Sequence, residues 1–207
     1  MQIVDKSYFN KGNFLHIPLA VQEPTGTEVP SNANELDALC IDIEKQILLN
    51  ALGLTLYNEL KALDGTTIEL PENARWKKLV QGDEYDEKVW LGLDNDNSLI
   101  AYRVFEQFTT ETNIRLSATG ATRVDAENAT NQTPAYLIAT ANNRFIKQYQ
   151  GEYLHAPIIN GVFEDWFGCS DSIEKSMYGY LVDKQTDFPK WNASKFVTYE
   201  SKNSFGI

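Results

Sequence analysis

The residues that could carry nucleophilic chemistry are Cys169 and His155, because an imidazole beside a thiol can take its proton and leave a reactive thiolate. The sequence GCSD around Cys169 adds no support for such a pair, and a small buried thiol is the simpler interpretation. The other histidine, His16, lies between Leu15 and Ile17, which favours a packed or half-exposed strand residue. A small hydrolase is therefore the weakest of three functional hypotheses.

Calcium binding is a second possibility, because the segment LDNDNSLI places Asp94, Asp96 and Ser98 at alternate positions. A calcium loop of this kind also needs glycine at its sixth position and glutamate at its twelfth. The chain has Leu99 and Phe105 there. We therefore interpret the segment as a solvated turn in which Ser98 caps the following helix.

The other acidic pairs are Glu84 with Asp86 and Glu164 with Asp165. In a chain with 29 acidic residues, such pairs are expected on solvated faces. The sequence has no glycine-rich phosphate loop and no HExxH, GxSxG or CxxC motif. We therefore expect no catalytic residue, no metal ligand and no cofactor.

Composition sets the class of protein. With 207 residues, 43% of them hydrophobic, the chain can bury one core with a small appended module at most. A net charge of -11 argues against a surface that grips nucleic acid. Because we find neither a signal-peptide pattern nor a membrane-spanning run, we expect a soluble protein made in a cytoplasm, with Cys40 and Cys169 reduced. The tryptophans are expected to anchor a core or an interface: Trp76, Trp90, Trp166 and Trp191.

The elements that would position these residues are mainly helical. Residues 1–31, interrupted by three prolines, predict an extended N-terminal arm with one strand. From Asn32 the apolar spacing predicts a helix that ends at Gly53, followed by a short helix over 54–63. Its inward face comprises Leu36, Leu39, Cys40, Ile43 and Ile47, whereas Asp37, Asp42, Glu44 and Lys45 mostly face elsewhere.

Further helices are predicted from Pro71 to Gly82, from Ser98 to about Leu116, and from Pro134 to Gly151. Between the last two lies the polar stretch 117–134, predicted as a long connecting loop. Residues 152–207 are aromatic and rich in turns, with one helix around 173–184 and an extended end. The predicted fold is mainly α: a helix bundle over 32–151, an N-terminal arm over 1–31, and a small irregular, β-containing C-terminal extension with a docking tail over 152–207.

The order of motifs resembles a known family. The segments ALGLTLYNELKAL, WKKLVQGDEYDEKVWLGL and LIAYRVFEQF, the ATG at 118–120 and the final NSFGI are similar to the head-tail connector (adaptor) family of tailed phages. Within that family the chain resembles the ring proteins of crAss-like and other Bacteroidales-infecting phages. The similarity covers roughly residues 35–151, and the part beyond Gly151 does not match a minimal adaptor.

The resemblance implies an adaptor-type bundle that forms a homo-oligomeric, twelve-fold ring below the portal protein, in the neck of the virion. Such a ring has no enzymatic activity, extends the DNA channel and docks the adjacent tail or neck protein. DNA passes through the lumen without specific binding, and no membrane is involved. Assembly would take place in the host cytoplasm.

Two sets of residues are predicted to make the contacts. Gly120, Arg123 and Val124, in the polar stretch, are expected at the subunit interface, because closed rings use heterologous contacts between different patches. The C-terminal residues expected to dock on the portal or another partner are Phe196, Val197, Tyr199 and Phe205. The alternative hypothesis is a monomeric binding module or assembly factor, in which the same segments recognise a transient partner.

Overall fold

The computed structural model describes residues 1–11, 14–18, 20–21, 32–112, 114–117, 120–123, 134–151, 153–155, 165–167 and 173–191. Helices account for 63% of them, which confirms the mainly α fold class. The α-helices are α1 (Asn32–Lys61), α2 (Ala74–Gln81), α3 (Leu99–Thr112), α4 (Pro134–Tyr149) and α5 (Met177–Asp183), and the 3-10 helices are η1 (Lys6–Asn10), η2 (Thr67–Glu69) and η3 (Pro71–Asn73).

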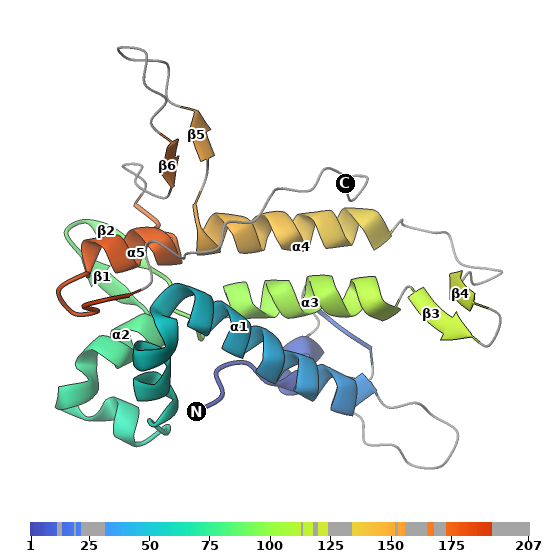
Figure 1. The fold of residues 1–207 in the computed structure, drawn as a ribbon, viewed down its shortest axis with the longest axis horizontal. Helices are drawn as coiled ribbons and strands as arrows, with labels where there is room; N and C mark the ends of the chain where they lie inside the picture. The colour runs from blue at the N-terminus through green and yellow to red at the C-terminus, as the bar shows by residue number, and fades with distance from the viewer. Residues whose placement is uncertain are drawn as a thin grey trace.

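Helix α3 is the centre of the bundle and packs against both α1 and α4 (Figure 1). It buries residues on nearly every side, including the successive residues Ile100, Ala101 and Tyr102, because a helix on each flank covers it. Arg144 of α4 reaches across to α3 and donates to the Tyr102 hydroxyl at 3.2 Å. These three helices form the body to which the other elements attach.

Helix α1 has a break at Gly53, whose φ of 76° and ψ of 168° are not helical. A positive φ costs glycine nothing, since it has no Cβ to clash with the backbone. The residue therefore turns the helix at the predicted place, and the prediction of two helical pieces is confirmed. The second piece leads to η2, η3 and α2, which ends at Gly82 as expected.

The strands form three separate two-stranded antiparallel hairpins. They are β1 (Asp83–Tyr85) with β2 (Lys88–Trp90), β3 (Ile114–Ser117) with β4 (Gly120–Arg123), and β5 (Tyr153–His155) with β6 (Asp165–Phe167). Figure 1 shows β1–β2 and β3–β4 at opposite ends of the long axis, while β5–β6 projects from the end of α4. In the β1–β2 turn, Asp86 and Glu87 both have positive φ, as a two-residue hairpin turn requires.

The prediction for the end of α3 and for the polar stretch is wrong in part. The helix ends at Thr112 instead of near Leu116, and residues 114–117 form a strand where the end of the helix was expected. Residues 120–123 form a second strand where a loop was expected. Three threonines in the last turn and Ile114 are β-branched and favour strand over helix. Residues 118–119 and 124–133 lie outside the described part.

The N-terminal segment contains a 3-10 helix, η1, and no strand among its described residues, so the predicted strand is not found there. Val4, Phe9, Leu15 and Ile17 of this segment are buried in the same hydrophobic cluster as the helices. Their apolar surface is removed from water by α1 and α3, which stabilises the fold. The described part of residues 1–31 is therefore part of the core, not a free arm.

Helix α4 begins at Pro134 and is followed by Gly151, both as predicted. The Gly151 N–H donates to the carbonyls of Ile146 at 3.2 Å and Lys147 at 3.1 Å, with a φ of 90° at the glycine. This is the hydrogen-bond pattern of a glycine helix stop. Helix α5 lies within the predicted range 173–184, and Met177, Leu181 and Phe188 join the common core.

Candidate interaction surfaces

The predicted subunit-interface residues fall on the β3–β4 hairpin or just after it. Gly120 pairs with Ser117 and Arg123 pairs with Ile114, so both belong to β4, whereas Val124 lies outside the described residues. The hairpin extends beyond the neighbouring ends of α3 and α4 (Figure 1). The structure therefore places a projecting hairpin where the sequence predicted a contact loop.

The predicted docking residues Phe196, Val197, Tyr199 and Phe205 all lie outside the described residues. The last described residue, Trp191, is partly buried and packs edge-on against Tyr178 at 5.5 Å between ring centroids. Trp191 therefore packs against α5 directly before the predicted docking residues.

Residues 173–191 are attached to the bundle through β2. The Val89 N–H donates to the Ile173 carbonyl at 2.7 Å, and the Lys175 N–H donates to the Val89 carbonyl at 2.8 Å. The segment therefore lies beside β2 as a parallel bridge on the edge that β1 does not use. Part of the predicted C-terminal extension is built into the helical body.

Asp83 is a buried carboxylate at the junction of α2, β1 and α5. The Nζ atoms of Lys78 and Lys184 lie 3.3 Å and 3.4 Å from its two oxygens, and the Tyr180 hydroxyl lies 3.5 Å away. A buried charge is tolerated where it is paired in this way. These contacts join α5 to the first hairpin.

Asp183 forms a second junction between α5 and the same hairpin. Lys88 of β2 donates to its carboxylate at 2.9 Å and the Tyr85 hydroxyl donates at 3.0 Å. These two hydrogen bonds outweigh burial, and the pKa of Asp183 is lower than its usual value. Lys184 also lies over the Tyr85 ring, with Nζ 3.9 Å from the ring centroid.

Aromatic packing covers this junction. Trp90 stacks on Tyr180 with ring centroids 5.4 Å apart, and Trp76 meets Phe188 edge-on at 5.3 Å. The Trp90 indole N–H donates to the Leu79 carbonyl at 2.9 Å. Both tryptophans are only 3% exposed, which confirms them as core anchors.

The tyrosines at this junction act as hydrogen-bond donors and not as bases. Burial, and then the nearby carboxylates Asp83 and Asp183, raise the pKa of Tyr180 and of Tyr85 above the usual value. Both hydroxyls therefore stay protonated at neutral pH. Carboxylates, lysines and tyrosines of this kind could form a proton-transfer site. Here they form hydrogen bonds and ion pairs with one another, and these contacts join α5 to the β1–β2 hairpin.

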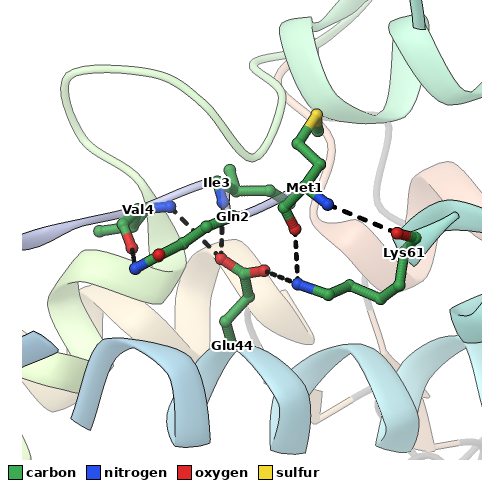
Figure 2. Close-up of polar contacts among 6 residues, drawn as sticks. All are labelled: Met1, Gln2, Ile3, Val4, Glu44 and Lys61. Atoms are coloured by element: carbon green, nitrogen blue, oxygen red, sulfur yellow. Dashed lines mark hydrogen bonds and ion pairs between the residues drawn. The ribbon is translucent and has the colours of Figure 1, made fainter. Parts of the chain in front are cut away.

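Glu44 corrects one prediction directly. The sequence pattern placed it mostly away from the core, yet it is 2% exposed and lies under the first residues of the chain (Figure 2). Its Oε2 accepts hydrogen bonds from the N–H groups of Ile3 at 2.7 Å and Val4 at 3.3 Å. The local helical pattern could not indicate this burial, because the segment that covers Glu44 is about 40 residues away in sequence.

Lys61, at the end of α1, completes the Glu44 site. Its Nζ lies 3.2 Å from Glu44 Oε1 and donates to the Met1 carbonyl, while the Met1 amino group donates to the Lys61 carbonyl at 3.4 Å. Figure 2 shows these groups converging between α1 and residues 1–4. The buried carboxylate therefore binds the N-terminal segment through backbone donors and one lysine.

The 3-10 helix η1 is anchored in the same way to the start of α3. The Tyr8 hydroxyl donates to the Asn95 carbonyl at 2.6 Å and accepts from the Ser98 N–H at 3.0 Å. Burial raises the pKa of Tyr8 to about 12. Ser98 precedes α3 as predicted, but its buried Oγ has no hydrogen-bond partner, so the predicted side-chain cap is not formed.

The thiol and histidine candidates show no assembled nucleophile among the described residues. Cys40 is buried and reduced, and burial raises its pKa to about 12, which keeps the thiol protonated. His16 was predicted as a packed or half-exposed strand residue; it is exposed and lies outside any strand, and Leu15 and Ile17 take the buried positions of this segment. His155 lies in β5, and Cys169, its proposed partner, lies outside the described part of the chain.

The acidic turn before α3 is consistent with a solvated turn. Asp96 is exposed and pairs with Lys11 at 3.0 Å, and Asn95 accepts from the Asn97 N–H at 2.7 Å. Glu84 and Asp86 are also exposed, as predicted. Across the described residues, no group of three or more acidic, histidine or cysteine side chains is placed to hold a metal ion.

None of the helices in the described ranges is both long and apolar enough to cross a membrane. Comparison with protein families, with curated proteins and with solved structures finds no match to this chain.

Proposed function

We propose that this chain is a structural virion protein: a head-tail connector that assembles into a ring below the portal, extends the DNA channel and docks the next tail component. The observation that supports this best is the division of the molecule into a body, packed around the common hydrophobic core, and hairpins that project from it. Residues from the N-terminal segment and from the segment 173–191 are packed into one core, whereas β3–β4 and β5–β6 extend from opposite ends of α4 (Figure 1).

The segments that carry the family resemblance form consecutive parts of that body. ALGLTLYNELKAL spans the kink and the second piece of α1, WKKLVQGDEYDEKVWLGL runs through α2 and the β1–β2 hairpin, and LIAYRVFEQF lies in α3. Within them, Gly92 has a φ of 87°, and a Cβ there would lie 2.6 Å from the Gln81 carbonyl carbon. The motif glycine thus has a physical reason, because only glycine fits where the chain after β2 passes the backbone at the end of α2.

Projecting hairpins suit a protein that works by assembly. A two-stranded hairpin is marginally stable in water unless another surface covers one of its faces. In a ring, each subunit can supply that cover for its neighbour, and many weak contacts add up to a stable assembly. The net charge of -11 also suits a channel through which DNA must move without adhering.

The proposal is tested by the size and the location of the protein. Light scattering and negative-stain imaging of the purified protein, alone and with its portal, should show a ring, and mass spectrometry should find the chain in purified virions. A strict monomer that does not bind the portal and is absent from virions would instead favour the transient-partner hypothesis.

A further inference from the structure

The β3–β4 hairpin has two different faces. Antiparallel pairing puts directly opposed residues on the same face of a hairpin, and the face alternates along each strand. The register therefore assigns one face to the positions Ile114, Leu116, Ala121 and Arg123, and the other to Arg115, Ser117, Gly120 and Thr122. A hairpin with one mainly apolar and one polar set of positions is typical of a sheet that another surface covers.

The hairpin also differs in charge from the rest of the chain. From Ile114 to Arg123 the sequence contains two arginines and no acidic residue. Without these two, 16 basic residues remain against 29 acidic ones, a balance of -13. The next charged residues, Asp125 and Glu127, are acidic, so this local excess of positive charge ends with the hairpin. Charge complementarity between surfaces favours an acidic partner for it, and a second copy of this chain is such a partner.

A suitable acidic surface lies at the other end of the molecule, on the β1–β2 turn. Glu84, Asp86 and Glu87 are exposed there and make no ion pair with any described residue. Lys88, the nearest base in sequence, is engaged by Asp183 at 2.9 Å. The turn is therefore acidic, and Figure 1 places it at the opposite end of the long axis from β3–β4.

We infer that the face of the β3–β4 hairpin that carries Ile114, Leu116 and Ala121 docks on the β1–β2 turn of the next copy. Arg123, at a position on that face, would then meet Glu84, Asp86 and Glu87, while Arg115, at a position on the other face, adds to the positive charge of the hairpin. This inference rests on the proposed ring and gives the ring its polarity. A contact between opposite ends is heterologous and head-to-tail, and it produces a closed ring when the rotation between subunits closes. The apolar positions of the hairpin are covered by the same contact.

The test exchanges charge between the two surfaces. The hairpin variant carries Arg115→Glu and Arg123→Glu, and the turn variant carries Glu84→Lys, Asp86→Lys and Glu87→Lys. Each variant alone brings like charges together and should lower the fraction of protein in rings at least about tenfold. An equimolar mixture restores opposite charges at every contact and should form rings again, as should a chain that carries all five substitutions.

A matched control reverses three exposed acidic residues elsewhere, with Glu35→Lys, Asp42→Lys and Glu72→Lys. It changes the net charge as much as the turn variant does, and should retain rings. Circular dichroism and thermal melting should show that every variant is folded: the substituted turn and control positions are solvent-exposed, and the hairpin extends past the ends of α3 and α4 (Figure 1).

The outcomes separate the two proposals. If the wild-type chain never forms rings, alone or with the portal, the ring itself is wrong. If the wild type forms rings and either variant does so equally well, the ring stands and the hairpin-to-turn contact is overturned. Failure of both the mixture and the five-substitution chain to recover assembly would also overturn the contact.

Discussion

The segment 173–191 and the β3–β4 hairpin both lie outside the bundle of α1, α3 and α4, yet they are attached to it differently. The first is fixed by a strand-like pairing with β2, by the carboxylates Asp83 and Asp183, and by stacked aromatic rings. The second extends past the ends of α3 and α4 (Figure 1). If the proposed ring is correct, we expect stability and assembly to depend on these separate parts of the chain, so that substitutions affect one without the other.

The N-terminal segment is also firmly attached to the body. Glu44 accepts hydrogen bonds from the backbone of residues 3 and 4, much as Asp83 pairs with Lys184 at the end of α5. Glu44→Ala should cause the largest loss of stability, about 3–5 kcal/mol, since it leaves Lys61 and two backbone N–H groups without their buried acceptor. Chemical denaturation measures the change. Asp42→Ala, exposed on the same helix, is the matched control and should stay within about 0.5 kcal/mol of the wild type. Equal effects of the two substitutions would contradict the anchoring role.

A smaller loss of stability is expected at Gly92, which lies just after β2 and against the end of α2. Gly92→Ala should destabilise the fold by about 2–3 kcal/mol, because it combines a positive φ with a Cβ that meets backbone atoms. Gly65→Ala is the control, since a Cβ there meets nothing within 4 Å. If both substitutions shift the denaturation midpoint equally, the close approach at Gly92 has no energetic role.

The ion pair between Asp183 and Lys88 should have a weaker, pH-dependent effect. The folded-state pKa of Asp183 is lower than its unfolded value near 3.8, so its contribution is present above about pH 3.8 and is lost as the pH falls below it. Because the carboxyl is partly exposed, Asp183→Asn should cost only about 0.5–1 kcal/mol at pH 7.

A double-mutant cycle with Lys88→Met, followed by denaturation at pH 7 and pH 3, measures this coupling. The coupling should be favourable at pH 7 and smaller at pH 3. A coupling free energy that grows as the pH falls would contradict a lowered pKa of Asp183 in the folded state.

The smallest effect on stability, and the largest on assembly, is expected at the hairpin. Deleting residues 120–131 should change the free energy of unfolding by less than about 0.5 kcal/mol, because the β3–β4 hairpin extends past the ends of α3 and α4 (Figure 1). The same deletion should abolish ring formation in light scattering. A deletion variant that still assembles normally would leave the hairpin without a role in the ring.

Sequence reasoning predicted the elements whose signals are local. The Gly53 break, the Pro134 start of α4 and the Gly151 stop depend on single residues with strong backbone preferences. It failed at Glu44 and at η1, because their burial depends on contacts between segments distant in sequence. The ion pair between Asp83 and Lys184 was missed for the same reason, since the two residues are about 100 residues apart.

At the candidate interface, the predicted conformation was wrong, and the contact itself stays a prediction. A polar stretch between two helices indicated a contact segment, and the structure places a hairpin at Gly120 and Arg123. The apolar Ile114 and Leu116 were assigned to the end of α3 because a short apolar run does not by itself distinguish helix from strand. Residues 114–117 are a strand because they pair with β4, a contact that the local sequence pattern does not show.

The central claim is that this body, with its projecting hairpins, is a ring subunit in the virion neck. An image of the neck at subnanometre resolution tests it most directly. The account predicts a ring of density directly below the portal, with each subunit fitted by the α1, α3 and α4 bundle and with β3–β4 reaching the neighbouring subunit. A neck whose density is fully explained by other proteins, with no place for this bundle, would contradict the account.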